Sequence, residues 1–222
     1  MALLHEATLV PSKLDLVVPW AASQPWFEGD PASVVKVAAY RLDDPAGEVG
    51  LETLLLRAGD GPVLQVPVTY RDAPLAGAEA SLVGTMRHSV LGERFVYDAV
   101  ADPVYLATLV ATALTGGGHA DIVVRAADGS EVTHESSTTV VGSGEPGTAV
   151  PPVEVGEATT VDGSTVVRAG GVTVVVARRP EGVTPRDLVS AAGDAHDESA
   201  AVLTGMWSDD SAPATLAVVL VH

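Results

Sequence analysis

Residues 62–70 read Pro-Val-Leu-Gln-Val-Pro-Val-Thr-Tyr, and this stretch decides the predicted fold. Apolar side chains occur at every second position, which is the period of a strand with one buried face. Proline cannot donate a hydrogen bond to a neighbouring strand, so Pro67 predicts a sheet edge or a bulge at that point.

Two strand-like stretches precede it, at residues 33–42 and 48–57. Residues 44–47 (Asp-Pro-Ala-Gly) and 59–61 (Gly-Asp-Gly) separate the three stretches as turns. No long helix intervenes that could carry the chain back for parallel pairing. Sequential hairpins of this kind predict an antiparallel sheet.

A helix is predicted directly after this sheet, at residues 102–115. Asp102 can cap its first turn and Pro103 fits the first helical position. Three consecutive glycines, at 116–118, end it. Its apolar stripe consists of Leu106, Leu109, Val110 and Ala113. An antiparallel sheet with a packed helix gives the predicted class, an α+β fold.

The N-terminal segment predicts a strand at residues 5–10 and then a helix. Ser12 and Asp15 have the spacing of a capping box at the start of that helix. Pro19 lacks the N–H that an inner helical residue donates, so we expect it to kink or end the helix.

Residues 119–222 predict a second, β-rich domain. Strands are expected at 122–124 and 132–140, separated by Asp128-Gly129, and after residue 152. The Gly- and Pro-rich residues 142–152 look like an exposed linker. We therefore divide the chain into 1–118 and 119–222, with the boundary somewhere within 116–152. The later strands are expected at 153–157, 164–168, 172–177, 202–207 and 215–221, with a helix at 184–193 that Thr184 caps.

Charge and composition exclude several classes of function. The 222 residues contain 12 Lys and Arg against 29 Asp and Glu, a formal net charge of −17. Such a surface repels nucleic acids and anionic membranes. The absence of cysteine excludes disulfides and thiolate chemistry. No apolar run is long enough to span a bilayer, and the N-terminus lacks the basic region of a signal peptide, so we expect a soluble cytoplasmic protein.

Residues 162–180 read Asp-Gly-Ser-Thr-Val-Val-Arg-Ala-Gly-Gly-Val-Thr-Val-Val-Val-Ala-Arg-Arg-Pro. This stretch resembles the nucleotide-binding small lobe of actinobacterial maltokinases, with Arg178 and Arg179 at the family's paired arginines. The resemblance places the catalytic lysine position at Val175. It places the position of the lysine's partner, a helix glutamate, near Leu188 and next to Asp187. Valine cannot steer or neutralise nucleotide phosphates, which argues against kinase activity.

The first part of the chain resembles the N-terminal cap of maltokinases and stand-alone cap-like proteins. The resemblance rests on residues 25–29 (Pro-Trp-Phe-Glu-Gly), 41–50 (Arg-Leu-Asp-Asp-Pro-Ala-Gly-Glu-Val-Gly), 68–75 (Val-Thr-Tyr-Arg-Asp-Ala-Pro-Leu) and 92–98 (Gly-Glu-Arg-Phe-Val-Tyr-Asp). It implies a cystatin-like cap that sits on the small lobe. In that family a large C-terminal lobe phosphorylates the sugar, and we expect this lobe, with its catalytic base and magnesium ligands, to be absent here.

The resemblance therefore predicts a non-catalytic binding or regulatory module, linked to trehalose, maltose or glycogen metabolism. We assign no catalytic, cofactor-binding or metal-binding residue and expect no cofactor. Two alternatives stay open: one half of a split sugar kinase whose large lobe is a separate chain, and a carbohydrate-binding protein. For the latter, the aromatic side chains of Trp20, Trp26 and Phe27 could stack on a sugar, although core or inter-domain packing is favoured.

Three further motifs have a plain structural interpretation. Residues 142–148 (Gly-Ser-Gly-Glu-Pro-Gly-Thr) superficially resemble a phosphate-binding loop but lack its lysine, and a linker explains them. Residues 162–165 could present amides to an anion, but a hairpin turn is favoured. Residues 194–197 (Asp-Ala-His-Asp) contain metal-ligand types, and a solvated loop is favoured.

The C-terminal strand predicted at 216–221 is almost wholly apolar. Soluble proteins do not leave such a strand exposed. In maltokinases the large lobe covers the underside of the small lobe, so we expect a second copy of the chain or a protein partner to cover it here, with a homodimer favoured.

Overall fold

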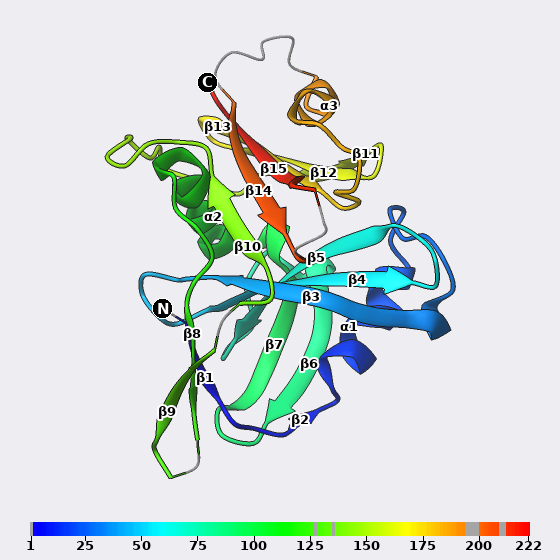
Figure 1. Ribbon diagram of the computed structural model, residues 1–222, viewed down its shortest axis with the longest axis vertical. Helices are drawn as coiled ribbons and strands as arrows, with labels where there is room; N and C mark the ends of the chain where they lie inside the picture. The colour runs from blue at the N-terminus through cyan, green and yellow to red at the C-terminus, as the bar shows by residue number, and fades with distance from the viewer. Residues whose placement is uncertain (1, 127, 135, 194–199, 209–211) are drawn as a thin grey trace.

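The computed structural model describes residues 2–126, 128–134, 136–193, 200–208 and 212–222. These residues form an α+β fold of three sheets and three α-helices, which confirms the predicted class (Figure 1). All strand pairs are antiparallel except one, the pairing of the N-terminal strand β1 (Ala2–His5) with β8 (Ile122–Arg125).

The first large sheet has six strands in the order β2-β6-β7-β5-β4-β3. The three central predictions are confirmed within two residues at each end. Their observed counterparts are β3 (Val34–Leu42), β4 (Gly50–Ala58) and β5 (Val63–Arg71). The other three strands are β2 (Leu9–Val10), β6 (Leu82–His88) and β7 (Gly92–Asp98).

The prediction that Pro67 marks a sheet edge is correct locally and wrong for the whole strand. β5 lies between β4 and β7, so it is an inner strand. The pairing with β7 begins only at Val68, which pairs with Asp98. Pro67 lies just before that point, where β7 does not yet pair with β5. No strand on that side therefore needs the N–H that proline lacks.

The N-terminal helix α1 (Lys13–Ala22) begins as predicted but does not end at Pro19. Ser12 caps it by accepting a hydrogen bond from the backbone N–H of Asp15. Pro19 is an exposed residue inside the helix, so the expectation that it ends the helix is wrong. Burial of Val17 and Ala21 against the first sheet outweighs the single backbone hydrogen bond that proline removes. The predicted 5–10 strand is also two separate strands, β1 and β2.

The second large sheet has the order β10-β14-β15-β13-β12-β11. The predicted 132–140 strand divides between two sheets, because β9 (Glu131–His134) joins β8 and β1 while β10 (Thr139–Gly142) joins this second sheet. Helix α3 (Pro185–Ala191) packs on one face of it. The remaining strands are β11 (Ala158–Val161), β12 (Ser164–Ala169), β13 (Val172–Ala177), β14 (Ala201–Met206) and β15 (Ala214–Val221).

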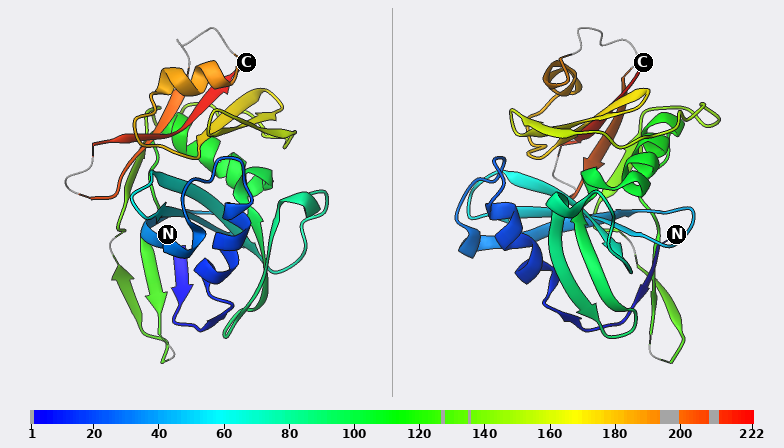
Figure 2. Two further views of the ribbon diagram at one scale, coloured as in Figure 1. Left: turned by 90° about the vertical axis from the view of Figure 1, so that its right-hand side faces the viewer. Right: turned by 180° about the vertical axis from the view of Figure 1, so that it is seen from behind.

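The long helix α2 (Pro103–Thr115) confirms its predicted cap, since the Asp102 carboxylate accepts from the Val104 N–H and Gly116 ends the helix in the left-handed conformation. Its buried side chains contribute to one apolar cluster that includes residues of both large sheets. Figure 2 shows the helix between the two sheets. The two predicted domains, 1–118 and 119–222, are closely connected. They share the apolar core around α2, and β1 of the first pairs with β8 of the second.

The C-terminal strand β15 lies inside its own sheet, between β13 and β14. Leu216 and Val219 belong to the cluster around α2, and Val218 and Leu220 to the cluster under α3. The chain's own helices therefore cover both faces of this strand. The reason given above for a second copy or a partner at this surface does not hold.

Candidate functional site

The position that the resemblance assigns to the catalytic lysine lies in an apolar core. Val175 on β13 is fully buried. Leu188 on α3, at the position expected for the lysine's acidic partner, belongs to the same buried cluster. The two positions that would hold an ion pair in a kinase thus come together, as the resemblance implies, and both carry aliphatic side chains. This arrangement offers no cation to a nucleotide phosphate.

Asp187, the acidic residue beside Leu188, is used by the helix itself. Its backbone N–H donates to the Thr184 hydroxyl, and its carboxylate accepts from the Thr184 backbone N–H at 2.9 Å. The hydrogen bonds with Thr184 lower the pKa of Asp187. The predicted Thr184 cap is therefore confirmed, and the reciprocal bonds make it a capping box that accounts for this carboxylate.

The paired arginines fasten the second sheet to the first. Buried Arg178 donates from Nη2 to the Asp98 carboxylate at 2.6 Å and from Nε to Thr165 at 2.7 Å. Its guanidinium lies 5.0 Å from the centre of the Trp26 ring. Arg179 forms an ion pair with Glu28 at 2.9 Å. Both arginines thus contact the first sheet or the segment before it.

Gln65 completes this contact from the first sheet. Its side-chain amide donates to the carbonyls of Ala177 and Leu216, each at 2.9 Å. Its backbone N–H donates to the Arg178 carbonyl at 2.8 Å. Because β7 does not reach this part of β5, the second sheet satisfies an amide that would otherwise be unpaired. Gln65 was part of the predicted strand, but its partners could not be inferred from the sequence.

The aromatic residues pack rather than form a platform. Trp26 is buried in the apolar cluster of the first sheet, and its ring centre is 5.9 Å from that of Trp20. Trp20 and Phe27 are partly buried against the same cluster. The favoured packing interpretation is therefore confirmed for these three residues.

The two glycine-containing loops also have structural roles. Asp162 and Gly163 both have positive φ, as a two-residue hairpin between β11 and β12 requires. In the 142–148 loop, the Gly144 N–H donates to the Ala113 carbonyl at the end of α2. A Cβ on Gly144 would lie 1.9 Å from the Leu114 carbonyl oxygen, so only glycine fits there. The loop therefore seals the end of α2.

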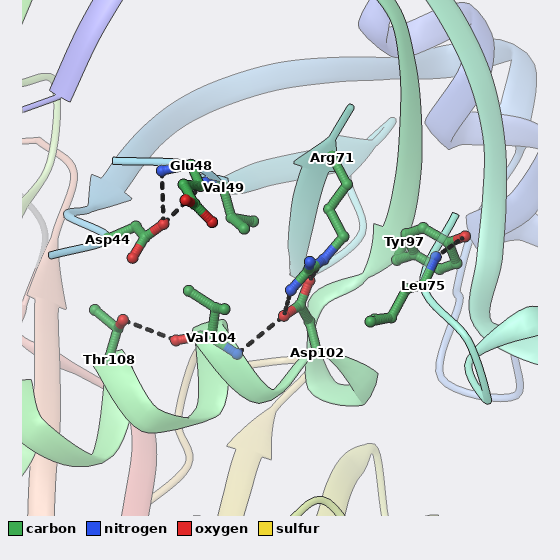
Figure 3. A network of polar contacts seen from close by, with 9 residues as sticks. All are labelled: Asp44, Glu48, Val49, Arg71, Leu75, Tyr97, Asp102, Val104 and Thr108. Carbon is green, nitrogen blue, oxygen red and sulfur yellow. Dashed lines mark hydrogen bonds and ion pairs between the residues drawn. The ribbon is translucent and has the colours of Figure 1, made fainter. Parts of the chain in front are cut away.

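A polar network around the start of α2 uses the cap-like sequence motifs (Figure 3). Arg71 donates two hydrogen bonds to the fully buried Asp102 carboxylate, each at 2.7 Å. The Leu75 N–H donates to the Tyr97 hydroxyl at 2.9 Å. The Asp44 carboxylate accepts from the Glu48 and Val49 N–H groups and closes the loop at residues 44–49. These motif residues hold loops and a helix start together.

A cavity of about 420 Å³ lies at the N-terminal side of the first sheet. The β1–β2 segment, the start of α1 and the loop between β3 and β4 enclose it together with β5, β6 and β7. Its charged and titratable wall residues include Lys13, Arg41, Arg94, His5 and His88, with Asp43, Asp44 and Glu48 from the loop. The cavity gathers five basic side chains in a strongly acidic protein.

One wall of the cavity is organised around Glu52, which lies opposite Arg41 on the neighbouring strand. Lys13 donates to Glu52 at 2.8 Å, and the Tyr70 hydroxyl donates to it at 2.8 Å. Burial raises the pKa of Glu52, but the charges of Arg41 and Lys13 and the two hydrogen bonds outweigh it. The resulting pKa is about 2, against an ordinary value of 4.5.

The cavity lining also carries two imidazoles. The rings of His5 and His88 meet edge to face with their centres 6.3 Å apart. Nδ1 of His88 accepts from the backbone N–H groups of Val90 and Leu91, so a neutral ring carries its proton on Nε2. Burial, and then the charges of His5, Arg94 and Lys13, lower the pKa of His88.

The Glu52 pKa predicts acid sensitivity. A carboxyl group whose pKa falls on folding adds stability above its unfolded-state pKa, and this stability is lost as the pH falls from 4.5 toward 2. The contribution at pH 7 is on the order of 3 kcal/mol. Urea unfolding at pH 7, 4.5 and 3 should show the stability difference between the native protein and Glu52→Gln shrinking across this range. A difference independent of pH would contradict the assignment, and the exposed Glu131→Gln serves as control.

Comparison with known protein families identifies the first part of the chain. Residues 20–102 match the family model of the maltokinase N-terminal cap domain. This part is therefore a maltokinase N-terminal cap-like domain, as its motifs predicted. The match extends from Trp20 in α1 to Asp102, the cap of α2. No curated protein matches the chain.

The remaining site predictions concern metals and membranes. Within the described ranges, no three His, Asp or Glu side chains form a group that could hold a metal ion. The Asp-Ala-His-Asp motif at 194–197 lies outside the described residues. None of the helices in the described ranges is long and apolar enough to cross a membrane.

Proposed function

We propose that this chain is a non-catalytic binding or regulatory module related to maltokinase, and that it does not itself transfer phosphoryl groups. The observation that supports this proposal is the shared apolar cluster of Val175 and Leu188. Phosphoryl transfer depends on charge stabilisation, and the small lobe normally supplies it through a lysine held by an acidic residue. Here both positions are aliphatic.

The same observation weighs against the split-kinase alternative. A separate large lobe could supply a base and metal ligands, but the phosphate-binding lysine would have to come from this chain. The carbohydrate-binding alternative loses its aromatic platform, since the Trp26 ring packs in the core and against Arg178. A binding role linked to carbohydrate metabolism remains the proposal that fits these residues best.

Calorimetry with magnesium-ATP tests the proposal directly. We expect no saturable heat at ATP concentrations up to the millimolar range and no sugar-dependent release of ADP in a coupled assay with maltose or glucose. The thermal unfolding transition of the same sample confirms that the protein is folded, and an active sugar kinase serves as positive control. Two results would overturn the proposal. One is micromolar ATP binding that persists after substitution of Arg94, which lines the cavity of about 420 Å³ at the first sheet. The other is any sugar-dependent turnover.

A further inference from the structure

The guanidinium of Arg41 lines the cavity of about 420 Å³ at the first sheet, and no role described so far accounts for it. The residue is only 8% exposed. Its Nε is buried without a hydrogen-bond partner, and none of the described residues accepts a hydrogen bond from its guanidinium. The Glu52 carboxylate influences it only through its charge, and the Tyr70 ring centre lies 5.9 Å away. A buried arginine with unused donors is costly unless an acceptor fills the site.

We propose that this cavity binds the phosphate group of a small, hydroxyl-bearing molecule such as a phosphorylated sugar. The inference deepens the proposed function, on which it rests, by giving the binding module a ligand class. Arginine pairs with phosphate through two parallel hydrogen bonds, and lysine adds a point charge.

Two other cations, Lys13 and Arg94, line the same cavity and add to its suitability for a phosphate. Lys13 is bound to Glu52, and its charge contributes to the lowered pKa of His88, so both groups lie within its electrostatic range. Arg94 has no carboxylate partner within the described part of the chain, and its charge also reaches His88. A neutral His88 keeps a donor on Nε2. A phosphate offers three terminal oxygens to these donors, whereas a carboxylate offers only two.

The loop at residues 43–48 supports a neutral, hydroxyl-bearing body for the ligand. Its acidic side chains Asp43, Asp44 and Glu48 line the same cavity. Their charges would repel a second anionic group, and the exposed Glu48 carboxylate can accept hydrogen bonds from hydroxyls, whereas Asp44 is already engaged by the backbone N–H groups of its own loop. The cavity of about 420 Å³ is also far larger than a lone phosphate ion and is in the range of small-molecule sites.

Isothermal titration calorimetry on the full chain, at low ionic strength, tests this proposal with four probes: glucose 6-phosphate, inorganic phosphate, glucose and succinate. We expect saturable binding of glucose 6-phosphate, weaker binding of inorganic phosphate, and none of glucose or succinate. Arg94→Gln, at a partly exposed position, should weaken glucose 6-phosphate binding by about tenfold or more, as should Arg41→Gln. Arg186→Gln is the matched control. It removes the same charge at an exposed position on α3, which packs on the second sheet, and should leave binding unchanged.

The outcomes separate clearly. No binding of either phosphate probe, equal loss in Arg186→Gln, or undiminished binding in Arg94→Gln would each overturn the proposal. Succinate binding as tightly as glucose 6-phosphate would overturn the assignment to phosphate, and inorganic phosphate binding as tightly would overturn the assignment of a hydroxyl-bearing body. If magnesium-ATP gives binding heat that disappears in Arg94→Gln, the ATP binds in this cavity. ATP that binds at the second sheet would give heat that Arg94→Gln does not change. Failure of this inference and failure of the non-kinase proposal are therefore distinguishable.

Discussion

Asp102→Ala should destabilise the protein by about 3–5 kcal/mol, the cost of breaking a buried ion pair by removing one partner. Asp102 is fully buried, accepts two hydrogen bonds from Arg71, and caps α2 through the Val104 N–H. The substitution removes the cap and leaves the mostly buried Arg71 guanidinium without its carboxylate. Because α2 contributes to the core shared by both large sheets, its loosening affects the whole fold. Urea unfolding monitored by circular dichroism measures the effect.

Two comparison variants separate the ion pair from the cap. Asp102→Asn keeps an acceptor for the Val104 N–H but loses the charge, so its loss of stability should be clearly smaller. Asp30→Ala removes an exposed cap, whose carboxylate accepts from the Ala32 N–H, and should cost about 1 kcal/mol. If Asp102→Ala costs no more than Asp30→Ala, the ion pair with Arg71 contributes no stability of its own.

Val175→Lys should be the most damaging single substitution considered for the second sheet. Val175 is fully buried, so burial should lower the pKa of a lysine amine there by about 3–5 units, or the lysine should disrupt the core around it. The cost of this ionisation at pH 7 is about 4–5 kcal/mol, and it should decrease at higher pH as the amine loses its charge in the unfolded state too. Unfolding measurements at pH 7 and pH 10 give the dependence. No ATP turnover should appear, although the substitution restores the kinase lysine.

Val175→Met is the matched control, since it adds length without charge and should cost about 1–3 kcal/mol. The double variant with Leu188→Glu restores both members of the kinase ion pair and should still lack turnover, because a buried pair in an apolar core supplies neither a base nor a metal site. A stable, ATP-binding Val175→Lys variant would show that this position opens to a nucleotide site instead of the α3 core.

Local sequence signals were sufficient for most elements of this fold. Alternation at 62–70, the Asp102-Pro103 start of α2 and the Thr184 capping box each specify their own structure through short-range chemistry. Long-range pairing was not visible in the same way. The 132–140 stretch contains two strands of different sheets, and β1 finds its parallel partner at β8 more than a hundred residues away. Pro19 does not end α1, because tertiary burial of the helix outweighs the local penalty of the proline.

The cavity shows a similar limit. The motif at 41–50 resembles the cap family, but its sequence alone does not indicate that Arg41 lines a cavity. The available signal was a charged residue in the apolar second half of a strand, next to Tyr40 and Leu42, because burial of a charge without a partner demands an explanation. Its companions Lys13 and Arg94 come from distant elements, α1 and β7, and only the folded sheet brings them together.

The placement of α2 changes what the Gly- and Pro-rich stretch at 142–152 signifies. It looks like a joint between modules, but the helix that precedes it lies in a core built by both halves, and Gly144 binds the end of that helix. Either half alone would expose to water the apolar side chains that it contributes to this shared core. We therefore expect the two halves to unfold in a single cooperative transition, because each stabilises the other through the core around α2.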